Sequence, residues 1–337
     1  MSLTIILIVL IAIISLLIFG RRRLLLTSLL VPVCVLLGMF TIAQHEAIPN
    51  FWYWLSLWTV LGGLVVSVTQ LGLAQPDTRV QLFLTRILPS ATVPCFLLLL
   101  WQGLVIGFGV PKGIFPSVGD VVTALRSSLP VFLNDSYVTF VQEVALGIAI
   151  GVPTGILSGI AIAYSRFLQR GFLPLAAAFG AVPIVGLAPV LGRAFGVDWQ
   201  SKAAVVVIVT FFPVLLNTVQ GLILVDALKL ELLHAYASSP LTIFRKLRFP
   251  NALPYIFNAL KIASVVSVIS VIVAEFLIPG PPRGLGQRIS LSARQGAYDV
   301  VFAAIFVSSL ISITIYGVIV VLERTFTGWH PSLRNES

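Results

Sequence analysis

Apolar residues occur along this chain in long, nearly uninterrupted runs, each bounded by short polar or basic segments. A helix that crosses a lipid bilayer needs about 20 predominantly apolar residues. Runs of this kind predict nine membrane-spanning helices, at residues 3–19, 24–44, 51–74, 88–110, 138–164, 172–191, 203–225, 256–278 and 300–322. The pattern therefore predicts an all-α polytopic membrane protein.

Composition supports this prediction and excludes other classes of protein. Residues of the set AVILMFWYC make up 58% of the 337 positions and only 10% are charged, whereas about 25% are charged in soluble domains. A soluble enzyme, a disordered protein and a disulfide-stapled secreted module are all excluded. Cys34 and Cys95 both lie within apolar runs, so we interpret them as packing residues.

Basic residues exceed acidic ones, with 21 Lys and Arg against 12 Asp and Glu. They flank the apolar runs and do not cluster among aromatic residues, so no nucleic acid is expected as a partner. Placing the N-terminus outside puts most of them, including Arg21–Arg23, on the cytoplasmic side, as the positive-inside rule requires. The sequence contains no GxxxxGK[ST] or HExxH pattern, so neither a nucleotide site nor a metal site is expected in this chain.

Glycines repeat every fourth residue within the predicted span 138–164. This spacing places them on one helix face, where a second backbone can approach closely. Helix packing is the favoured interpretation, although a smooth face could also slide during a conformational cycle. The four residues are Gly147, Gly151, Gly155 and Gly159.

Three charged residues, Glu143, Lys261 and Glu275, fall inside predicted spans. An ionised group at the bilayer centre costs roughly 2.5–3.5 kcal/mol on insertion scales. Each of the three lies near a span end. Glu143 and Lys261 could therefore lie at the membrane interface, and Glu275 could be a solvated helix end. These positions are as consistent with the sequence as a role in a pathway.

Two segments outside these spans are longer than simple turns. In 111–137, Ser117 and Asp120 precede a periodic apolar stretch and predict a capped amphipathic helix at the outer interface. In 226–255, a helix over 225–236 is followed by Ser238-Ser239-Pro240, which predicts a break and a second helix with basic residues along one side. Pro250 and Pro254 are expected to end that second helix. Such a helical loop, fixed at both ends to spans, could transmit force or simply rest on lipid headgroups.

This loop resembles the EAA loop of binding-protein-dependent ABC importer permeases, whose pattern is Glu-Ala-Ala, three residues, Gly, nine residues, Ile, one residue, Leu-Pro. Glu231 and Pro250 stand at the matching separation, and the following Asn251 to Phe257 resembles the family's entry into the membrane. Two leucines replace the alanines, Ala237 replaces the glycine, and Leu247 and Phe249 replace Ile and Leu.

Further stretches resemble the nitrate/sulfonate/taurine-type branch of this family. They are Phe115-Pro116-Ser117, Val182 to Pro189, Ala274-Glu275-Phe276 with Gly284-Leu285-Gly286, and Leu322-Glu323-Arg324 with Trp329 to Ser332. Glu143 is a departure, because it occupies a place where relatives often carry arginine. The resemblance covers about 88–331.

The resemblance implies a six-helix ABC importer type I-like core at 88–331, preceded by an extension of three spans at 1–87 and followed by a short tail at 332–337. We expect the extension to serve packing or assembly. The protein would be the permease subunit of an importer in the bacterial inner membrane, and it would not itself be an enzyme. Pro183, Pro189 and Glu275 are candidates for the pathway.

The resemblance also implies partners. These are a second permease subunit, two ATP-binding cassette subunits that carry ATP and Mg²⁺, an extracytoplasmic substrate-binding protein, and membrane lipid. Residues of the coupling loop 226–255 would contact the ATPase, and the candidates are Glu231, Ala237, Ser238, Arg245, Lys246, Arg248, Pro250 and Pro254. The alternatives are an ion-coupled secondary transporter or channel without an ATPase, and a membrane scaffold that transports nothing.

Overall fold

The computed structural model describes residues 33–35, 37, 51–73, 79–180, 182–278, 280–281 and 283–328. Every regular element within these residues is helical. The predicted span 3–19, most of 24–44, and Arg21–Arg23 lie outside the described residues, as do Trp329 to Ser332 and the predicted tail. The prediction of nine spans can therefore be examined for seven of them.

Six helical segments are long and apolar enough to cross a membrane: 51–69, 87–107, 129–164, 199–223, 240–277 and 298–327. Each contains or overlaps a predicted span. The seventh predicted span, 172–191, is not one continuous helix, and it counts as a span only if two bent helices are taken together. It corresponds to α8 (Arg166–Gly180) and α9 (Ile184–Phe195), which are bent by 98° relative to each other. Pro183 explains the break, because proline pushes the residue before it out of the helical conformation.

The chain divides into two compact units, residues 1–124 with 296–299 and residues 125–295 with 300–337. In the first unit, α3 (Phe51–Leu73) packs on α4 (Arg79–Gly107). The buried Tyr53 hydroxyl donates a hydrogen bond to the carbonyl oxygen of Gly103 at 2.7 Å. The predicted boundary between residues 87 and 88 falls inside the continuous helix α4.

The predicted amphipathic helix in 111–137 is present as α5 (Val118–Ser127). Ser117 Oγ accepts a hydrogen bond from the Asp120 amide, and Asp120 Oδ2 accepts one from the Ser117 amide, which is a capping-box arrangement. Burial raises the pKa of Asp120, but hydrogen bonds from Lys112 and Ser117 outweigh it and hold the pKa below its usual value.

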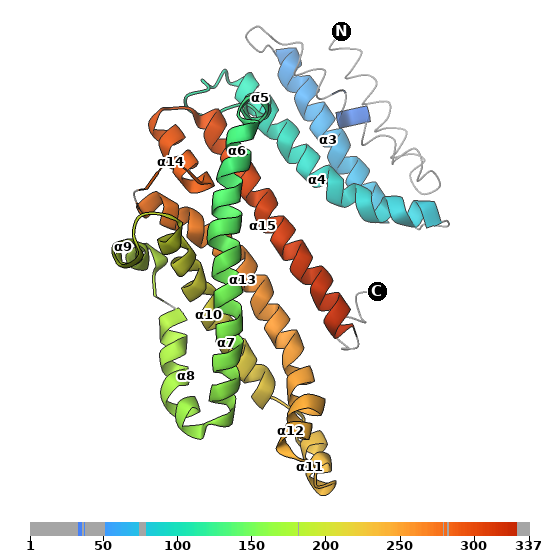
Figure 1. Cartoon of the computed structure of the whole chain (residues 1–337). Coiled ribbons are helices and arrows are strands. Elements are labelled where there is room, and N and C mark those ends of the chain that lie inside the picture. The colour runs from blue at the N-terminus through green and yellow to red at the C-terminus, as the bar shows by residue number, and fades with distance from the viewer. Residues whose placement is uncertain are drawn as a thin grey trace. The chain divides into compact units, whose positions relative to one another are not determined.

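Three helices form the centre of the second unit (Figure 1), namely α7 (Leu146–Tyr164), α10 (Trp199–Ile223) and α13 (Phe249–Leu277). α15 (Tyr298–Thr327) also contributes from residue 300 onward. Buried side chains such as Val206 and Val271 join α7, α10 and α13 into one apolar core. α14 (Leu285–Arg294) lies at one end of this unit, and the coupling loop lies at the other (Figure 1).

Two helices continue where the sequence predicted interruptions. α6 (Leu129–Ser136), the π-helix η1 (Tyr137–Ala145) and α7 follow without a gap, so this span begins at Leu129 and not at 138. α12 (Pro240–Ile243), the π-helix η2 (Phe244–Arg248) and α13 are also continuous. Pro250, at the start of α13, and Pro254 are both accommodated inside this continuous helical segment. The prediction that these prolines end the helix is wrong.

Candidate functional site

The coupling loop begins with α11 (Ala227–Ala235), one turn after α10 ends. Asp226 caps it by accepting a hydrogen bond from the Leu228 amide at 2.9 Å, which satisfies one of the free N–H groups at a helix start. Glu231 lies on this helix with its side chain exposed. None of the residues of α11 is buried, so the helix stands clear of the core.

Ala237 ends α11 in a left-handed conformation, with a φ of 49°. Its amide donates to the His234 carbonyl at 2.9 Å, and the Ser238 amide donates to the Leu233 carbonyl at 3.0 Å. These two bonds form a Schellman motif, whose left-handed position usually holds glycine. The glycine of the EAA pattern thus corresponds to a position that needs positive φ, and alanine occupies it at a cost of about 1–2 kcal/mol.

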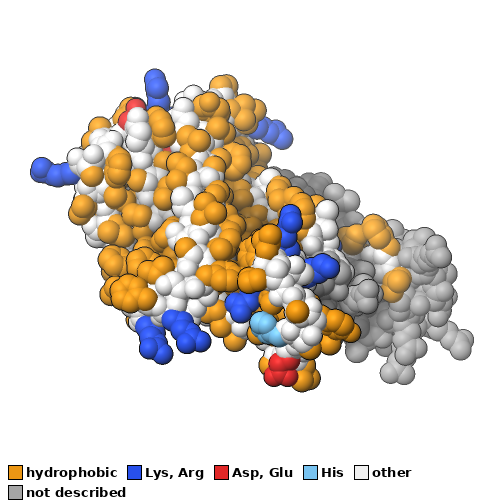
Figure 2. Space-filling model, turned by 60° about the horizontal axis from the view of Figure 1, so that its bottom comes forward, with side chains coloured by type: hydrophobic (Ala, Val, Ile, Leu, Met, Phe, Trp, Pro, Cys, Tyr) orange, Lys and Arg blue, Asp and Glu red, His pale blue; other side chains and the backbone are white. Residues whose placement is uncertain are grey.

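An exposed apolar stripe follows one side of α11. Its members are Leu228, Leu232 and Tyr236, spaced by four residues and exposed by 76%, 56% and 76%. The same end of the unit carries Lys and Arg side chains among hydrophobic ones (Figure 2). Arg245 and Lys246 are exposed there as well. A surface of this kind is typical of a binding site for another protein.

The second half of the loop is anchored to the core. Ile243 is buried, and Phe244 packs on the cluster formed by Ala163, Leu222 and Ile256. Arg248, at 5.5 Å from the Tyr164 ring centroid, is placed for a cation–π contact. The helix α12–η2 therefore cannot move without moving the adjoining spans.

Asn251 joins the two spans that flank the loop. Its Nδ2 donates hydrogen bonds to the carbonyls of Gly221 and Leu224, at 2.8 and 2.9 Å. A Cβ on Gly221 would lie 2.7 Å from the Ala252 Cα, so glycine allows the backbones of α10 and α13 to touch here. The loop and both spans are thus connected at one rigid point.

The four predicted packing glycines all lie at the contact of α7 with α10. A Cβ on any of them would come within 2.8–3.0 Å of a backbone carbonyl oxygen of α10. The opposing carbonyls belong to Ala203, Val207, Phe211 and Leu215. This contact extends along α7 as a close helix–helix interface.

The predicted pathway prolines lie at α9. Pro183 precedes the helix as its N-cap residue and Pro189 lies within it, and both are exposed. The opposite side of α9 is buried, where Ala188 contacts Val205, Ala274 and Ile278. An exposed apolar face, which includes Val190, remains on this helix.

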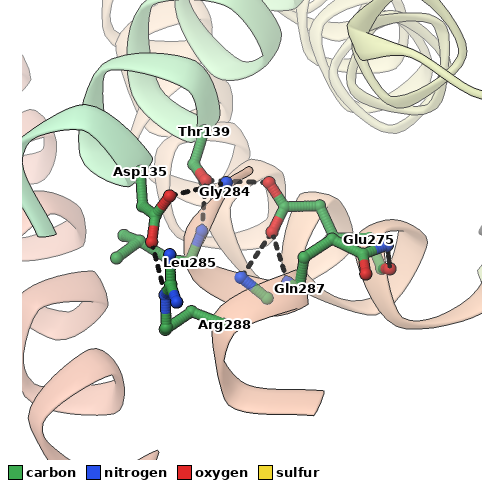
Figure 3. A network of polar contacts seen from close by, with 8 residues as sticks. Asp135, Thr139, Glu275, Gly284, Leu285, Gln287 and Arg288 are labelled. Carbon is green, nitrogen blue, oxygen red and sulfur yellow. Dashed lines mark hydrogen bonds and ion pairs between the residues drawn. The ribbon is translucent and has the colours of Figure 1, made fainter. Parts of the chain in front are cut away.

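Glu275 is buried in a network at the N-terminus of α14 (Figure 3). Its Oε1 accepts a hydrogen bond from Thr139 Oγ1 at 2.8 Å, and its Oε2 accepts from the amides of Gly286 and Gln287. The interpretation of Glu275 as a solvated helix end is therefore wrong. A carboxylate at this position also interacts favourably with the helix dipole.

The same helix end binds a second acid from the other side of the network (Figure 3). Asp135 accepts hydrogen bonds from the Gly284 amide at 3.2 Å and from Arg288 Nε at 2.8 Å. The Leu285 amide donates to Thr139 Oγ1 at 2.8 Å. The four amides at residues 284–287, which a helix leaves unpaired, are thus all satisfied by side chains from η1, α6 and α13.

Glycine is required at two positions of this network. Gly284 has a φ of 108°, and a Cβ there would lie 2.2 Å from Glu275 Oε1. A Cβ on Gly286 would lie 2.6 Å from Glu275 Oε2 and 2.7 Å from the Ile272 carbonyl oxygen. The sequence Gly-Leu-Gly is therefore explained by the carboxylate that its backbone surrounds.

The other two charged residues inside spans are also buried or paired. Glu143 is 1% exposed, so its side chain does not reach the surface of the unit. Lys261 is bonded to Glu323, with Nζ at 3.0 Å from Oε1 and 2.9 Å from Oε2. This pair joins α13 to α15 and removes the need for either charge to reach water.

Sequence reasoning missed several of these residues: Asp135, Thr139, Lys202, Asn251, Gln287, Arg288 and Glu323. One signal was present, because Asp135, Thr139 and Glu143 are spaced by four residues and share one helix face. The partners on the 284–288 segment and on α15 could not be identified from spacing, since they come from elements distant in the chain.

The second unit is a bundle of helices with close small-residue packing and an exposed helical loop fixed between two spans. Residues 151–328 match the family described as the binding-protein-dependent transport system inner membrane component. Curated relatives support the match. A probable ABC transporter permease of Haemophilus influenzae is 30% identical over 68% of this chain and 93% of its own length.

The formylaminopyrimidine transport permease ThiX of Halalkalibacterium halodurans is 32% identical over 55% of this chain and 74% of its own. The taurine transport permease TauC of Escherichia coli is 27% identical over 55% of this chain and 65% of its own length. Among solved structures, the MetNI methionine ABC transporter in inward-facing conformations aligns with a TM-score of 0.44 and 20% identity, covering 63% of this chain and 99% of that chain.

This chain belongs to the family of inner-membrane components of binding-protein-dependent transport systems. It is a multi-pass inner-membrane permease of the ABC importer class, as the resemblance predicted, and the sulfonate/taurine-type branch is represented among its relatives. Nothing in these comparisons supports the ion-coupled transporter or channel.

Proposed function

We propose that the coupling loop of this permease binds an ATPase subunit, which supplies ATP and Mg²⁺, and that the permease contains no nucleotide site of its own. The observation that carries this proposal is the exposed apolar stripe of Leu228, Leu232 and Tyr236 on a helix without a buried residue. Burying such a stripe in a partner's groove would contribute about 25 cal/mol for each Å² of apolar surface.

Charged residues would add specificity to this contact. Glu231, Arg245 and Lys246 are exposed on the same loop as the stripe, and Ser238 and Ala237 shape the turn between the two helices. Charges at the rim of an interface influence partner choice and association rate more than affinity. Arg248 faces the Tyr164 ring, so we assign it to anchoring more than to the ATPase.

The mechanism follows from the way the loop is attached. A push on α11 and α12 would pass through Asn251 and the Gly221–Ala252 contact to α10 and α13. These spans would tilt together with α7, because the glycine contact does not allow α7 and α10 to separate. Two discrete arrangements of the bundle would then open the pathway alternately to the two sides.

The complete transporter would hold two permease subunits, two ATPase subunits and an extracytoplasmic binding protein that delivers a small solute. Pro183 and Pro189 on the exposed side of α9 are candidates for the wall of the pathway. Relatives are named for solutes as different as taurine, riboflavin and formylaminopyrimidine, so the substrate is expected to be chosen mainly by the binding protein. The residues before 88 are expected to serve packing or assembly.

Co-purification of the tagged permease with its cognate ATPase tests this proposal. Leu228→Ser with Leu232→Ser should reduce recovery of the ATPase at least tenfold without reducing insertion into the membrane. The matched control is Phe167→Ser, since Phe167 is also exposed but belongs to α8 and not to the coupling loop. If the wild type, the double variant and the Phe167→Ser control recover equal amounts of ATPase, docking through this stripe is refuted.

A further inference from the structure

A cavity of about 360 Å³ lies in the second unit, between η1, the start of α10, and Pro281 and Arg283. The elements that contribute its lining residues lie toward the end of the unit that carries α14, away from the coupling loop (Figure 1). Tyr137, Glu143, Asp198, Trp199, Lys202 and Arg283 are among the residues that line it. Its volume falls within the range of about 300–1,000 Å³ that small-molecule sites occupy.

Glu143 provides an acceptor in this cavity. Its Oε2 is buried and has no hydrogen-bond partner among the described residues. Leaving a buried acceptor unpaired costs about 1–3 kcal/mol. A ligand with an N–H or O–H group would satisfy this oxygen.

Lys202 and Arg283 provide donors on the same cavity. Lys202 is only 4% exposed, and its Nζ donates one hydrogen bond, to the Val197 carbonyl at 2.6 Å. An ammonium group has three N–H donors, so two remain for a ligand. Arg283 is exposed, and within the described part of the chain its guanidinium forms no ion pair.

The charges of the cavity are balanced but not neutralised by contact. Glu143 and Asp198 are acidic and Lys202 and Arg283 are basic, and none of these four forms an ion pair with another in the described residues. A solute with charges of both signs can pair with both sides at once, whereas a simple anion or cation pairs with one and leaves the other desolvated.

We propose that this cavity binds a small organic anion that also carries an amino group, with the anionic group at Lys202 and Arg283 and the amino group at Glu143. That this solute is the one the transporter carries rests on the proposed function. Binding of the solute to the cavity does not rest on it, because such binding requires neither the ATPase nor the binding protein.

The experiment measures binding to the full-length permease in lipid nanodiscs, without other subunits, by saturation-transfer NMR. The probes are the ω-amino acids from glycine to 5-aminopentanoate, each compared with the carboxylate and the amine of the same length. At least one amino acid should bind at least tenfold more tightly than both of its matched analogues. The proposal is overturned if no amino acid binds saturably, or if the matched carboxylate binds equally well.

Variants assign the binding to the cavity. Lys202→Met and Glu143→Leu should each weaken binding at least tenfold, and Glu143→Gln, which removes the charge but keeps an acceptor oxygen, should weaken binding less than Glu143→Leu. Arg283→Gln should weaken binding about fivefold. Because Arg283 is exposed, this variant still tests the cavity if the variants at buried positions do not fold. Arg294→Gln is the control, an exposed arginine that does not line the cavity. Unchanged binding in Arg283→Gln and any folded Lys202→Met would overturn the proposal.

Failure of this inference and failure of the proposed function are distinguishable. Co-purification with the ATPase does not involve the cavity, and solute binding in nanodiscs does not involve the coupling loop. A permease that recovers its ATPase but binds no amino acid would refute the cavity proposal alone.

Discussion

Adding one methyl group at the centre of the α7–α10 contact should destabilise the protein. In Gly151→Ala, the new Cβ would lie 2.1 Å from Thr210 Oγ1 and 2.8 Å from the Val207 carbonyl oxygen, where ordinary contacts begin at 3.4 Å. The carbonyl belongs to the backbone and cannot rotate away. Thr210 is also held, because its Oγ1 donates to the Val206 carbonyl at 2.8 Å. The two helices must therefore move apart.

The magnitude follows from two opposing effects. Overpacking of a close interface costs about 1–3 kcal/mol, while replacing glycine by alanine inside a helix contributes about 0.5–1 kcal/mol of stability. The expected net loss is about 1–2 kcal/mol. A loss of this size lowers the melting temperature by roughly 2–8 °C, at about 2–4 °C for each kcal/mol in a large domain.

Thermal unfolding in detergent, followed by fluorescence-detected size-exclusion chromatography, measures this loss. Gly317→Ala is the matched control, since Gly317 also lies inside a span and a Cβ there would meet nothing within 4 Å. The control should melt at or slightly above the wild-type temperature. Gly151→Ala combined with Thr210→Ala should recover part of the loss, because only the clash with the carbonyl remains. If Gly151→Ala melts as high as Gly317→Ala, the packing argument is wrong.

Three further substitutions test separate contacts. Ala237→Gly removes the cost of the left-handed conformation, about 1–2 kcal/mol, so amide hydrogen exchange in 233–238 should slow, whereas an unchanged rate would contradict the strain. Glu275→Leu removes the acceptor opposite the Gly286 and Gln287 amides, at about 1–3 kcal/mol for each unpaired group. Limited proteolysis should then cut 283–294 sooner than in wild type, and equal cutting would exclude this role. Lys261→Met leaves the 8% exposed Glu323 unpaired and should lower the free energy of unfolding by about 1–2 kcal/mol. If a double-mutant cycle with Glu323→Gln gives no coupling energy, the ion pair does not contribute to stability.

Much of the membrane topology could be predicted because it depends on local composition. Apolar runs of sufficient length identified α3, α4, α10 and α15, since each such helix satisfies its own backbone hydrogen bonds and needs only an apolar exterior in lipid. Helix starts were predictable for the same local reason at Ser117 and Ser239, whose hydroxyls bond to amides three residues later. The glycine repeat likewise identified a face on which another helix packs.

The predictions that were wrong concern prolines and buried charges. Pro183 interrupts the helical conformation between α8 and α9, whereas Pro254 lies inside a continuous helix. A proline alone does not decide between these outcomes, because neighbouring helices can stabilise or replace the missing hydrogen bond. Glu143 and Glu275 lie near span ends in the sequence, but folding covers them with other segments.

The sequence by itself determined that this chain is a helical membrane permease, where most of its spans lie, and that a helical loop resembling an EAA loop joins two of them. Only the tertiary structure decided what the polar residues do, because their partners come from distant elements. Asp135, Thr139 and Glu275 satisfy the first amides of α14, Lys261 meets Glu323, and Lys202 and Glu143 line one cavity. The basic residues that first indicated only orientation thus serve in a helix-end network, an ion pair between spans and a candidate ligand site.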